Sequence, residues 1–415
     1  MQVEIICTGD EILSGKIINS NFSYMSRKLE EVGLSVVWGT TVGDDRKELL
    51  DAFILASKRS DAVIVNGGLG PTVDDLSQEI ASEASGMELE LRTDWLNKME
   101  KFFTMRGRTM TENNKKQAML PKTSELIDNP VGTACGFAIN IGKSRFFFTP
   151  GVPRELFRML ENEIIPRLLD LSGEKVITKL KTFHSYGIGE SRADSILNDS
   201  LKLSPDSIVK LGFQAHYPQL ETKLYIKAKS LEQIESNLKP VENDIRRKLN
   251  NFIFAEDKDT LEGVIVRQLE KNNETIAIAE LKTNGGTAAR LSSNDPSGRL
   301  LKCGFFSNDI ENIHAQFKIQ KNNNLDILDS DAIASAVRVH FSTSYGLSVI
   351  IKETIDNEAE AYISLSNSEN IISRIGYFVG DEQRIRLGAV EMALDCLRRY
   401  LYNLPFNEKS DFEKL

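Results

Sequence analysis

Hydrophobic and polar positions near the start of the chain alternate between two periods. Apolar residues recur every three or four positions in two stretches, which predicts helices with one buried face, and short continuous apolar runs between them predict buried strands. Gly33 follows the first helical stripe and is typical of a helix C-terminus. The predicted order of strand, helix, strand, helix and strand rests on Val3–Cys7, on Phe22, Met25, Leu29 and Val32, on Leu34–Val42, on Leu49, Leu50, Phe53 and Ile54, and on Ala62–Val65.

The predicted strands all lead into glycines and acidic residues. Right-handed strand–helix–strand crossovers build a parallel sheet, and the ligands of such sheets bind at the carboxyl ends of the strands. The segments that follow the strands are Thr8–Glu11, Gly43–Asp45 and Asn66–Asp75. We therefore expect their glycines and carboxylates to gather at one edge of one sheet, and this edge is the candidate site.

The pattern changes after Pro166 and predicts a small α+β domain. Val176 and Ile177 are strand-like, Ser191–Leu197 is helix-like, and apolar positions alternate with polar ones over Leu220–Ile226. Alternation with a period of two is typical of a strand with one buried face. This middle domain is expected to span residues 170–255, after a first domain at residues 1–169.

A third domain is predicted after the middle one. A helix-like stripe begins at Leu261, a strand-like run covers Thr275–Ala279, and a closing helix carries Val390, Leu394, Leu397 and Leu401 on one face. The predicted fold class is therefore α/β throughout, with the third domain at residues 256–405. The charged residues 406–415 are expected to form a loose tail.

The composition is that of an ordinary globular protein. The chain has 415 residues, of which 41% are hydrophobic and 27% are charged, and at about 150 residues per domain it should hold two or three domains. A net charge of −9 argues against nucleic acid or an anionic membrane as a general partner. The chain begins without the basic region of a signal peptide, and its apolar runs are too short for a membrane span. We expect a cytoplasmic location.

The cysteines and histidines do not form a metal motif. Cys7, Cys135, Cys303 and Cys396 are far apart in the sequence and make no C-x-x-C pair, which argues against a zinc ribbon and a disulfide framework. The 4 histidines form no H-E-x-x-H motif. A metal is therefore expected to be held by carboxylate oxygens.

The segment Gly67–Thr72 has the composition of a phosphate-binding loop. Its glycines let the backbone approach a ligand closely, and Pro71 and Thr72 are typical of a first helical turn, whose free N–H groups would face an anion. The acids that follow, and those after the neighbouring strands, could hold a hard divalent cation. The alternative is a structural turn whose acids only stabilise the start of a helix.

Four spaced motifs resemble those of the CinA family, and the resemblance extends over essentially the whole chain. The motifs are Thr8–Gly15, Asn66–Asp75, Asn129–Phe137 and Pro150–Glu155. The resemblance implies an N-terminal domain of the molybdopterin-binding (MoaB/MogA-like) fold, a KH-like middle domain and a C-terminal nicotinamide mononucleotide deamidase domain. It also implies that the first domain is a divalent-metal-dependent ADP-ribose pyrophosphatase, which yields AMP and ribose 5-phosphate.

The chemistry of that reaction assigns roles to residues of the candidate site. Hydrolysis of a pyrophosphate needs a cation to neutralise charge and acidify water, and donors that hold the diphosphate. We expect Asp44, Asp75 and Glu155 to be catalytic, without a choice of general base, and Asp10, Asp44, Asp74 and Asp75 to bind Mg²⁺, Mn²⁺ or Co²⁺. The expected substrate-binding residues are Thr8, Gly9, Glu11, Asn21, Gly67, Gly68, Gly70, Pro71, Thr72, Gly132, Thr133, Pro150 and Gly151.

The third domain departs from the family at the positions that carry the deamidase chemistry. Leu281 stands at the nucleophilic serine of the A-E-S-x-T-G-G motif, and Phe306 and Glu311 stand at the tyrosine and lysine of a later motif. Leucine has no nucleophilic atom. Lys282, Ser292 or Ser293 could substitute in principle, but we expect this domain to be a scaffold without deamidase activity.

Two other functions remain open beside the hydrolase. The same fold and glycine loop bind molybdopterin in relatives, so a pterin-binding protein or transferase is an alternative. A nucleotide-binding scaffold without turnover is another. We expect a homodimer with ADP-ribose as its small-molecule partner, and neither a membrane nor nucleic acid as a partner.

Overall fold

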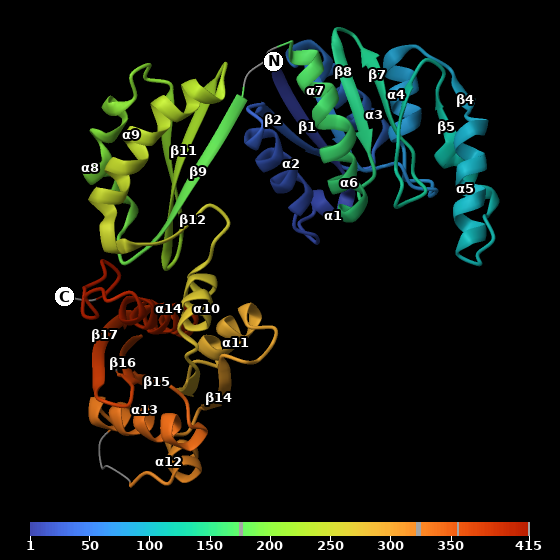
Figure 1. Ribbon diagram of the computed structural model, residues 1–415. Helices are drawn as coiled ribbons and strands as arrows, with labels where there is room; N and C mark the ends of the chain where they lie inside the picture. Colours follow the sequence, from blue (N-terminus) through green and yellow to red (C-terminus); the bar gives the residue numbers. More distant parts are fainter. Residues whose placement is uncertain (174–176, 321–324, 355–356, 414–415) are drawn as a thin grey trace. The chain divides into compact units, whose positions relative to one another are not determined.

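The computed structural model describes residues 1–173, 177–320, 325–354 and 357–413, and the chain divides into two compact units (Figure 1). The first unit covers Met1–Lys179 and the second covers Leu180–Leu415. None of the described helices is long and apolar enough to cross a membrane.

The first unit is built on a sheet of six strands in the order β2-β1-β3-β8-β7-β6. Neighbours from β2 to β8 are parallel, and β7 and β6 extend the sheet in antiparallel pairs. The strands are β1 (Gln2–Thr8), β2 (Ser35–Val42), β3 (Ala62–Asn66), β6 (Glu125–Ile127), β7 (Gly136–Ile141) and β8 (Ser144–Thr149). Because β1 leads outward to β2 and the chain returns to β3 on its other side, the strand order reverses at β1.

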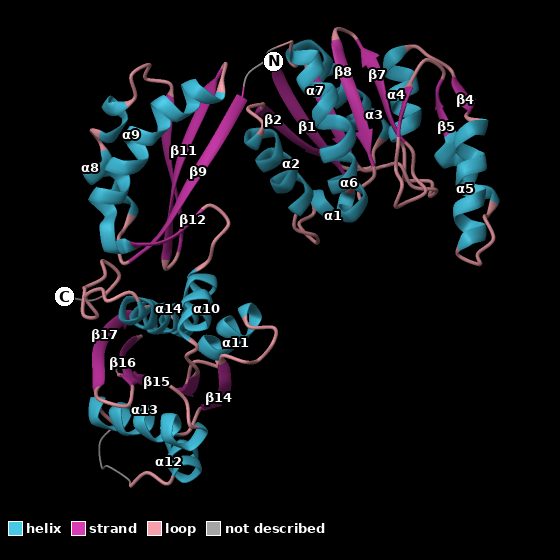
Figure 2. Cartoon of the chain, viewed as in Figure 1, coloured by secondary structure: helices cyan, strands magenta, loops and turns pink. Residues whose placement is uncertain are grey.

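Helices cover both faces of this sheet (Figure 2), and each face has its own apolar core. One core receives α3, α4 and α5, and the other receives α2, α6 and α7. The bounds are α1 (Asp10–Leu13), α2 (Ser20–Glu31), α3 (Arg46–Arg59), α4 (Ser77–Ser85), α5 (Thr93–Met105), η1 (Glu112–Ala118), α6 (Pro153–Met159), η2 (Leu160–Ile164) and α7 (Ile165–Ser172), with a small ribbon of β4 (Leu89–Leu91) and β5 (Met119–Pro121).

The strands and helices predicted for the first 66 residues are confirmed, but the helix expected at Pro71 and Thr72 is wrong. Those two residues lie in a turn, and α4 begins only at Ser77. The Asp75 carboxylate accepts hydrogen bonds from the Thr72 amide, at 2.9 Å, and from the Thr72 hydroxyl. An aspartate that bonds to nearby backbone in this way competes with helix formation.

The second unit begins with an antiparallel sheet in the order β10-β11-β9-β12, packed on α8 and α9. The α+β pattern predicted for this segment is confirmed, although Val176 lies outside the described residues. The elements are β9 (Ile177–Tyr186), α8 (Glu190–Leu197), η3 (Ser200–Leu203), β10 (Val209–His216), β11 (Gln219–Ala228), α9 (Leu231–Leu249), η4 (Asn250–Phe252) and β12 (Ile253–Glu256).

The rest of the second unit is a five-stranded sheet in the order β14-β13-β15-β16-β17. One core packs α10 and α14 against it, and another packs α12 and α13, so both faces are covered. The elements are α10 (Leu261–Asn272), β13 (Ile276–Leu281), α11 (Gly286–Asn294), β14 (Leu301–Ser307), α12 (Ile310–Phe317), α13 (Ile327–Phe341), β15 (Tyr345–Glu353), β16 (Glu358–Ser366), β17 (Ile371–Val379) and α14 (Glu382–Leu401).

The expectation of a loose tail is wrong for the described residues up to 413. The Asp411 amide donates to the Gly187 carbonyl at 3.0 Å, and the Asp411 carboxylate pairs with Arg192 at 2.7 Å. Glu413 pairs with the buried Arg374, and Phe406 is buried in the core. The acidic residues Asp411 and Glu413, whose charge predicted a solvated tail, therefore hold the tail in place through ion pairs with Arg192 and Arg374.

Candidate functional site

A pocket of the first unit lies at the carboxyl ends of its parallel strands, where the strand order reverses. Its volume is about 550 Å³. The segments that follow β1, β2, β3 and β8 all contribute to its lining, together with the start of α2. This is the edge at which a doubly covered sheet places its ligand.

Two consecutive glycines form the floor of the pocket after β3. Gly67 has φ +118° and Gly68 has φ +66°, conformations that residues with a side chain avoid. A Cβ on Gly67 would lie 2.8 Å from the Thr8 carbonyl oxygen, and a Cβ on Gly68 would lie 3.2 Å from the Ser77 Cβ. Ser77 stabilises this turn, since its hydroxyl donates to the Gly67 carbonyl at 2.9 Å. The backbone here leaves no room for side chains.

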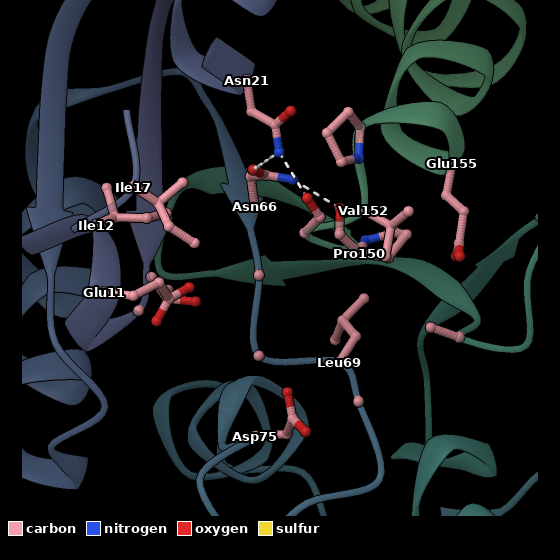
Figure 3. Close-up of a pocket in the computed structure, with 18 of the residues that line it drawn as sticks. Glu11, Ile12, Ile17, Asn21, Asn66, Leu69, Asp75, Pro150, Val152 and Glu155 are labelled. Atoms are coloured by element: carbon pink, nitrogen blue, oxygen red, sulfur yellow. Dashed lines mark hydrogen bonds between the residues drawn. The ribbon is translucent and has the colours of Figure 1, made fainter. Parts of the chain in front are cut away.

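A pair of buried asparagines ties together the segments around the pocket (Figure 3). The Asn21 amide donates to Asn66 Oδ1 at 2.9 Å and to the Gly151 carbonyl at 2.7 Å. The Asn66 amide donates to the Pro150 carbonyl at 2.7 Å. Asn21 Oδ1 and Thr8 Oγ1 are buried and lack hydrogen-bond partners among the described residues. Thr8 and Asn21 both line the pocket, and a buried polar atom without a partner is costly, so a bound ligand or water that reached these two atoms would relieve that cost.

Acidic residues on one side of the pocket repel one another. Asp10 and Asp44 exchange hydrogen bonds, from the Asp10 amide to Asp44 Oδ2 at 3.1 Å and from the Asp44 amide to Asp10 Oδ1 at 3.2 Å. Burial raises the pKa of Asp44, and the nearby carboxylates of Asp10, Glu11 and Asp74 raise it further. An excess of carboxylates around a half-buried acid is the electrostatic setting that a bound cation relieves.

The remaining acids approach the pocket from other directions. Figure 3 shows Glu11, Asp75 and Glu155 on separate sides of it. The Asn129 amide donates to Glu155 Oε2 at 2.7 Å, and Asp75 is bound to Thr72. Over the described ranges of the chain, no group of three or more His, Cys, Asp or Glu residues is placed to hold a metal ion. The donors are hard oxygens of the kind that a divalent cation prefers, so their chemistry fits such an ion.

Most of the residues expected at the site do line the pocket. They are Thr8, Gly9, Glu11, Asn21, Asp44, Gly67, Gly68, Gly70, Pro71, Asp74, Asp75, Thr133, Pro150, Gly151 and Glu155. Asp10, Thr72 and Gly132 lie outside the lining. Asp10 and Thr72 instead bond to lining carboxylates, and a Cβ on Gly132 would overlap the Glu155 carboxylate. The roles given to all these residues remain predictions.

Several residues that line the pocket were not among the expected site residues, although Ile12 and Asn66 lie in segments that the sequence analysis named. Ile12, Ile17 and Ile18 form part of its wall, and Asn66 and Gln117 contribute amides. Gln117 joins two lining segments, because its amide donates to the Leu69 carbonyl at 3.2 Å and its Oε1 accepts from the Thr133 hydroxyl at 3.1 Å. The position of Asn66 at the end of a buried strand was a usable signal, whereas Gln117 gave none, since it lies far from the strand ends in the sequence.

The degenerate motif of the third domain lies at the end of β13. Leu281 is the last residue of that strand and is buried. The buried Glu280 beside it accepts hydrogen bonds from the amides of Thr287, at 3.1 Å, and Ala288, at 2.9 Å. The Lys282 ammonium pairs with Glu353 at 2.9 Å. The start of α11 is thus occupied by the protein's own carboxylate.

The fold defines an α/β protein whose first unit resembles molybdopterin-binding domains and carries a pocket at the carboxyl ends of its parallel strands. Residues 4–170 match the family described as "Probable molybdopterin binding domain", and residues 180–255 match the "Damage-inducible protein CinA KH domain". A relative in Clostridium novyi (strain NT), named as a competence-damage inducible protein, is 33% identical over 412 residues, which are 97% of this chain and 99% of the relative.

The chain belongs to the CinA family. A CinA-like protein of Geotalea uraniireducens (strain Rf4) is 29% identical over 430 residues, which cover 99% of this chain and 100% of that protein. Among solved structures, the protein CinA from Thermoplasma acidophilum, whose function its authors call unknown, is 33% identical. It matches 41% of this chain and 97% of its own, with a TM-score of 0.37.

Proposed function

We propose that the first unit hydrolyses the pyrophosphate bond of ADP-ribose, giving AMP and ribose 5-phosphate, with the help of a divalent cation. The observation that carries this proposal is the meeting of a side-chain-free glycine floor with an excess of carboxylates in one pocket. The glycine floor suits a diphosphate, and the carboxylates suit a divalent cation. The volume of about 550 Å³ suits a ligand of nucleotide size.

The substrate would be held by groups that lack partners in the protein. We assign the Thr8 hydroxyl to a phosphate oxygen and Asn21 Oδ1 to a ribose hydroxyl; both atoms are buried without a partner, so a small shift of these side chains would open them to the ligand. Gly67 and Gly68 give the loop beside the diphosphate a shape that only glycine adopts easily, because both have positive φ and an added Cβ would meet Thr8 or Ser77. Such contacts fix the phosphorus at which water attacks.

We assign the cation to Asp44 with one further lining carboxylate, Asp74 or Asp75, and with phosphate oxygens of the substrate, because no three acids of the described residues are placed around one ion. Asp10 would orient Asp44 through their two hydrogen bonds. When bound, a divalent cation neutralises charge on the diphosphate and lowers the pKa of a water molecule. We assign the removal of the proton from the attacking water to Glu155, which reaches the pocket from α6 and is held by Asn129. Carboxylates on different sides of one pocket can then serve separate purposes.

The third domain is proposed to be a scaffold without deamidase activity. Leu281 offers no nucleophile, and two of the three groups that could replace it, Lys282 and Ser293, are already engaged. Lys282 pairs with Glu353 at 2.9 Å, and the Ser293 hydroxyl donates to the Ala289 carbonyl of its own helix at 2.9 Å.

A second candidate function for the first unit is the binding or transfer of a molybdopterin-type ligand, which the family match of residues 4–170 favours. The two candidates differ in the group that attacks phosphorus, which is water in the hydrolase and a group of the pterin in the transferase. Release of AMP from ADP-ribose in water would favour the hydrolase.

The acidic residues provide the test. Asp44→Asn and Asp75→Asn each remove one charged oxygen, so each should lower the rate of AMP release by at least ~100-fold while the fold is kept. Asp51→Asn is the matched control, because Asp51 is an exposed acid on α3 away from the pocket, and its rate should equal that of the unmodified protein. Full activity in both pocket variants would refute the assignment.

A further inference from the structure

The pocket has two apolar parts, one formed by isoleucines that follow β1 and another formed by Leu69, Pro150 and Val152. Ile12, Ile17 and Ile18 all line the pocket, and we call these three residues the isoleucine ledge. Ile17 is 56% exposed and Ile18 is 89% exposed. Figure 3 shows Ile12 and Ile17 side by side at the edge of the pocket. Large apolar side chains exposed at a ligand site, and not scattered over the surface, indicate contact with an apolar part of the ligand.

The backbone holds the ledge in a defined position. The Ile17 amide donates to the Glu11 carbonyl at 3.0 Å, and the Ser20 amide donates to the Ile18 carbonyl at 2.8 Å. Asn19 then caps α2, because its side chain accepts from the Phe22 amide at 3.0 Å. The isoleucines are therefore exposed on an ordered turn. A ligand that packs against them does not have to order the turn first.

The polar and apolar walls of the pocket divide the ligand between them. The glycine floor, Thr8 and Asn21 offer the backbone and polar atoms that suit phosphates and ribose. The ledge offers only methyl and methylene groups, which suit the flat face of a heterocycle. We propose that the isoleucine ledge is the subsite for the nucleobase, an inference that rests on the proposed nucleotide hydrolysis.

The ledge acts on binding and not on the chemical step. Isoleucine has no hydrogen-bonding group, so the ledge stabilises a stacked base without contacting the reacting phosphorus. Such contacts are equally strong in the bound substrate and in the transition state. Removal of the ledge should therefore raise KM for ADP-ribose and leave kcat unchanged.

The test compares a ligand that has a base with one that lacks it. AMP and ribose 5-phosphate are titrated separately, by calorimetry with Mg²⁺, into the full chain and into the double variant Ile17→Ala, Ile18→Ala. Loss of the apolar contacts of two isoleucines should raise the Kd for AMP by roughly tenfold. The Kd for ribose 5-phosphate should stay the same.

Leu13→Ala is the matched control. Leu13 is 55% exposed on α1, close in sequence to the ledge, but it lies outside the pocket lining. Its variant should bind both ligands as the unmodified protein does.

Equal weakening of both ligands in the double variant would overturn the inference, as would an unchanged Kd for AMP or failure of the unmodified chain to bind AMP. Because these are binding measurements, the ledge is tested even if ADP-ribose is not hydrolysed. Selective loss of AMP binding in a protein that releases no AMP would support the subsite and refute the proposed hydrolase.

Discussion

Gly68→Val adds a side chain to a crowded position of the pocket floor. Gly68 has φ +66°, where an L-residue costs about 1–2 kcal/mol. Its new Cβ would also lie 3.2 Å from the Ser77 Cβ and press on the Ser77 hydroxyl. That hydroxyl would have to give up its bond to the Gly67 carbonyl, which contributes about 0.5–1.5 kcal/mol. The total loss of stability is therefore roughly 1.5–3.5 kcal/mol.

Gly86→Val separates the backbone strain from the effect on the pocket. Gly86 has φ +68°, nearly the same as Gly68, but a Cβ there meets no atom within 4 Å. This control should lose only the backbone cost of about 1–2 kcal/mol. At about 2–4 °C per kcal/mol for a unit of this size, Gly68→Val should unfold a few degrees below Gly86→Val.

The two variants should differ more in binding than in stability. We expect the Kd for AMP, measured by calorimetry, to rise at least tenfold in Gly68→Val, which is about 1.4 kcal/mol, and to stay unchanged in Gly86→Val. Thermal unfolding followed by circular dichroism gives the stability of each. If both variants bind AMP as the unmodified protein does, the glycines are turn residues only and the floor does not contact the ligand.

Two further predictions concern the second unit. The unmodified protein should not convert nicotinamide mononucleotide to nicotinic acid mononucleotide in a chromatographic assay. Leu281→Ser alone should not restore the reaction, because Phe306 and Glu311 also stand where the family has a tyrosine and a lysine. Robust turnover by the unmodified protein would show that another group, such as Lys282, carries the chemistry. Hydrogen bonds from Arg246 and Lys181 lower the pKa of Glu256 from its ordinary value of 4.5 to about 2. The ionised carboxylate therefore stabilises the folded protein fully at pH values above 4.5, and this contribution is lost as the pH falls toward about 2. Glu256→Gln should therefore destabilise the protein by roughly 1–2 kcal/mol at pH 7, with a difference that shrinks below pH 4.5 in urea titrations; a difference independent of pH would contradict the ion pair.

The sequence predicted the position of the site better than its details. Strand ends can be located from periodicity, and parallel strands bring their carboxyl ends together, so Thr8, Asp44 and Gly67 were expected in one place and line one pocket. The distribution of the acids within the pocket was not predictable, because it depends on local bonds such as those between Asp10 and Asp44.

Two of the errors arise because polar side chains find partners that the sequence pattern does not reveal. Pro71 and Thr72 suit the start of a helix, but the Asp75 carboxylate accepts a hydrogen bond from the Thr72 amide, and α4 begins only at Ser77. Asp411 and Glu413 look like solvated tail residues until Arg192 and Arg374, distant in sequence, provide their partners. The isoleucine ledge was missed for the opposite reason, since apolar residues in a sequence are expected to be buried.

The most direct measurement of the central claim is the product analysis of ADP-ribose incubated with the purified full chain. With Mg²⁺, Mn²⁺ or Co²⁺ present, we expect AMP and ribose 5-phosphate to appear in equal amounts, at a rate that EDTA abolishes and that Asp75→Asn lowers at least ~100-fold. The absence of AMP with all of these ions, or AMP release that persists in both Asp44→Asn and Asp75→Asn, would contradict a pyrophosphatase in this pocket.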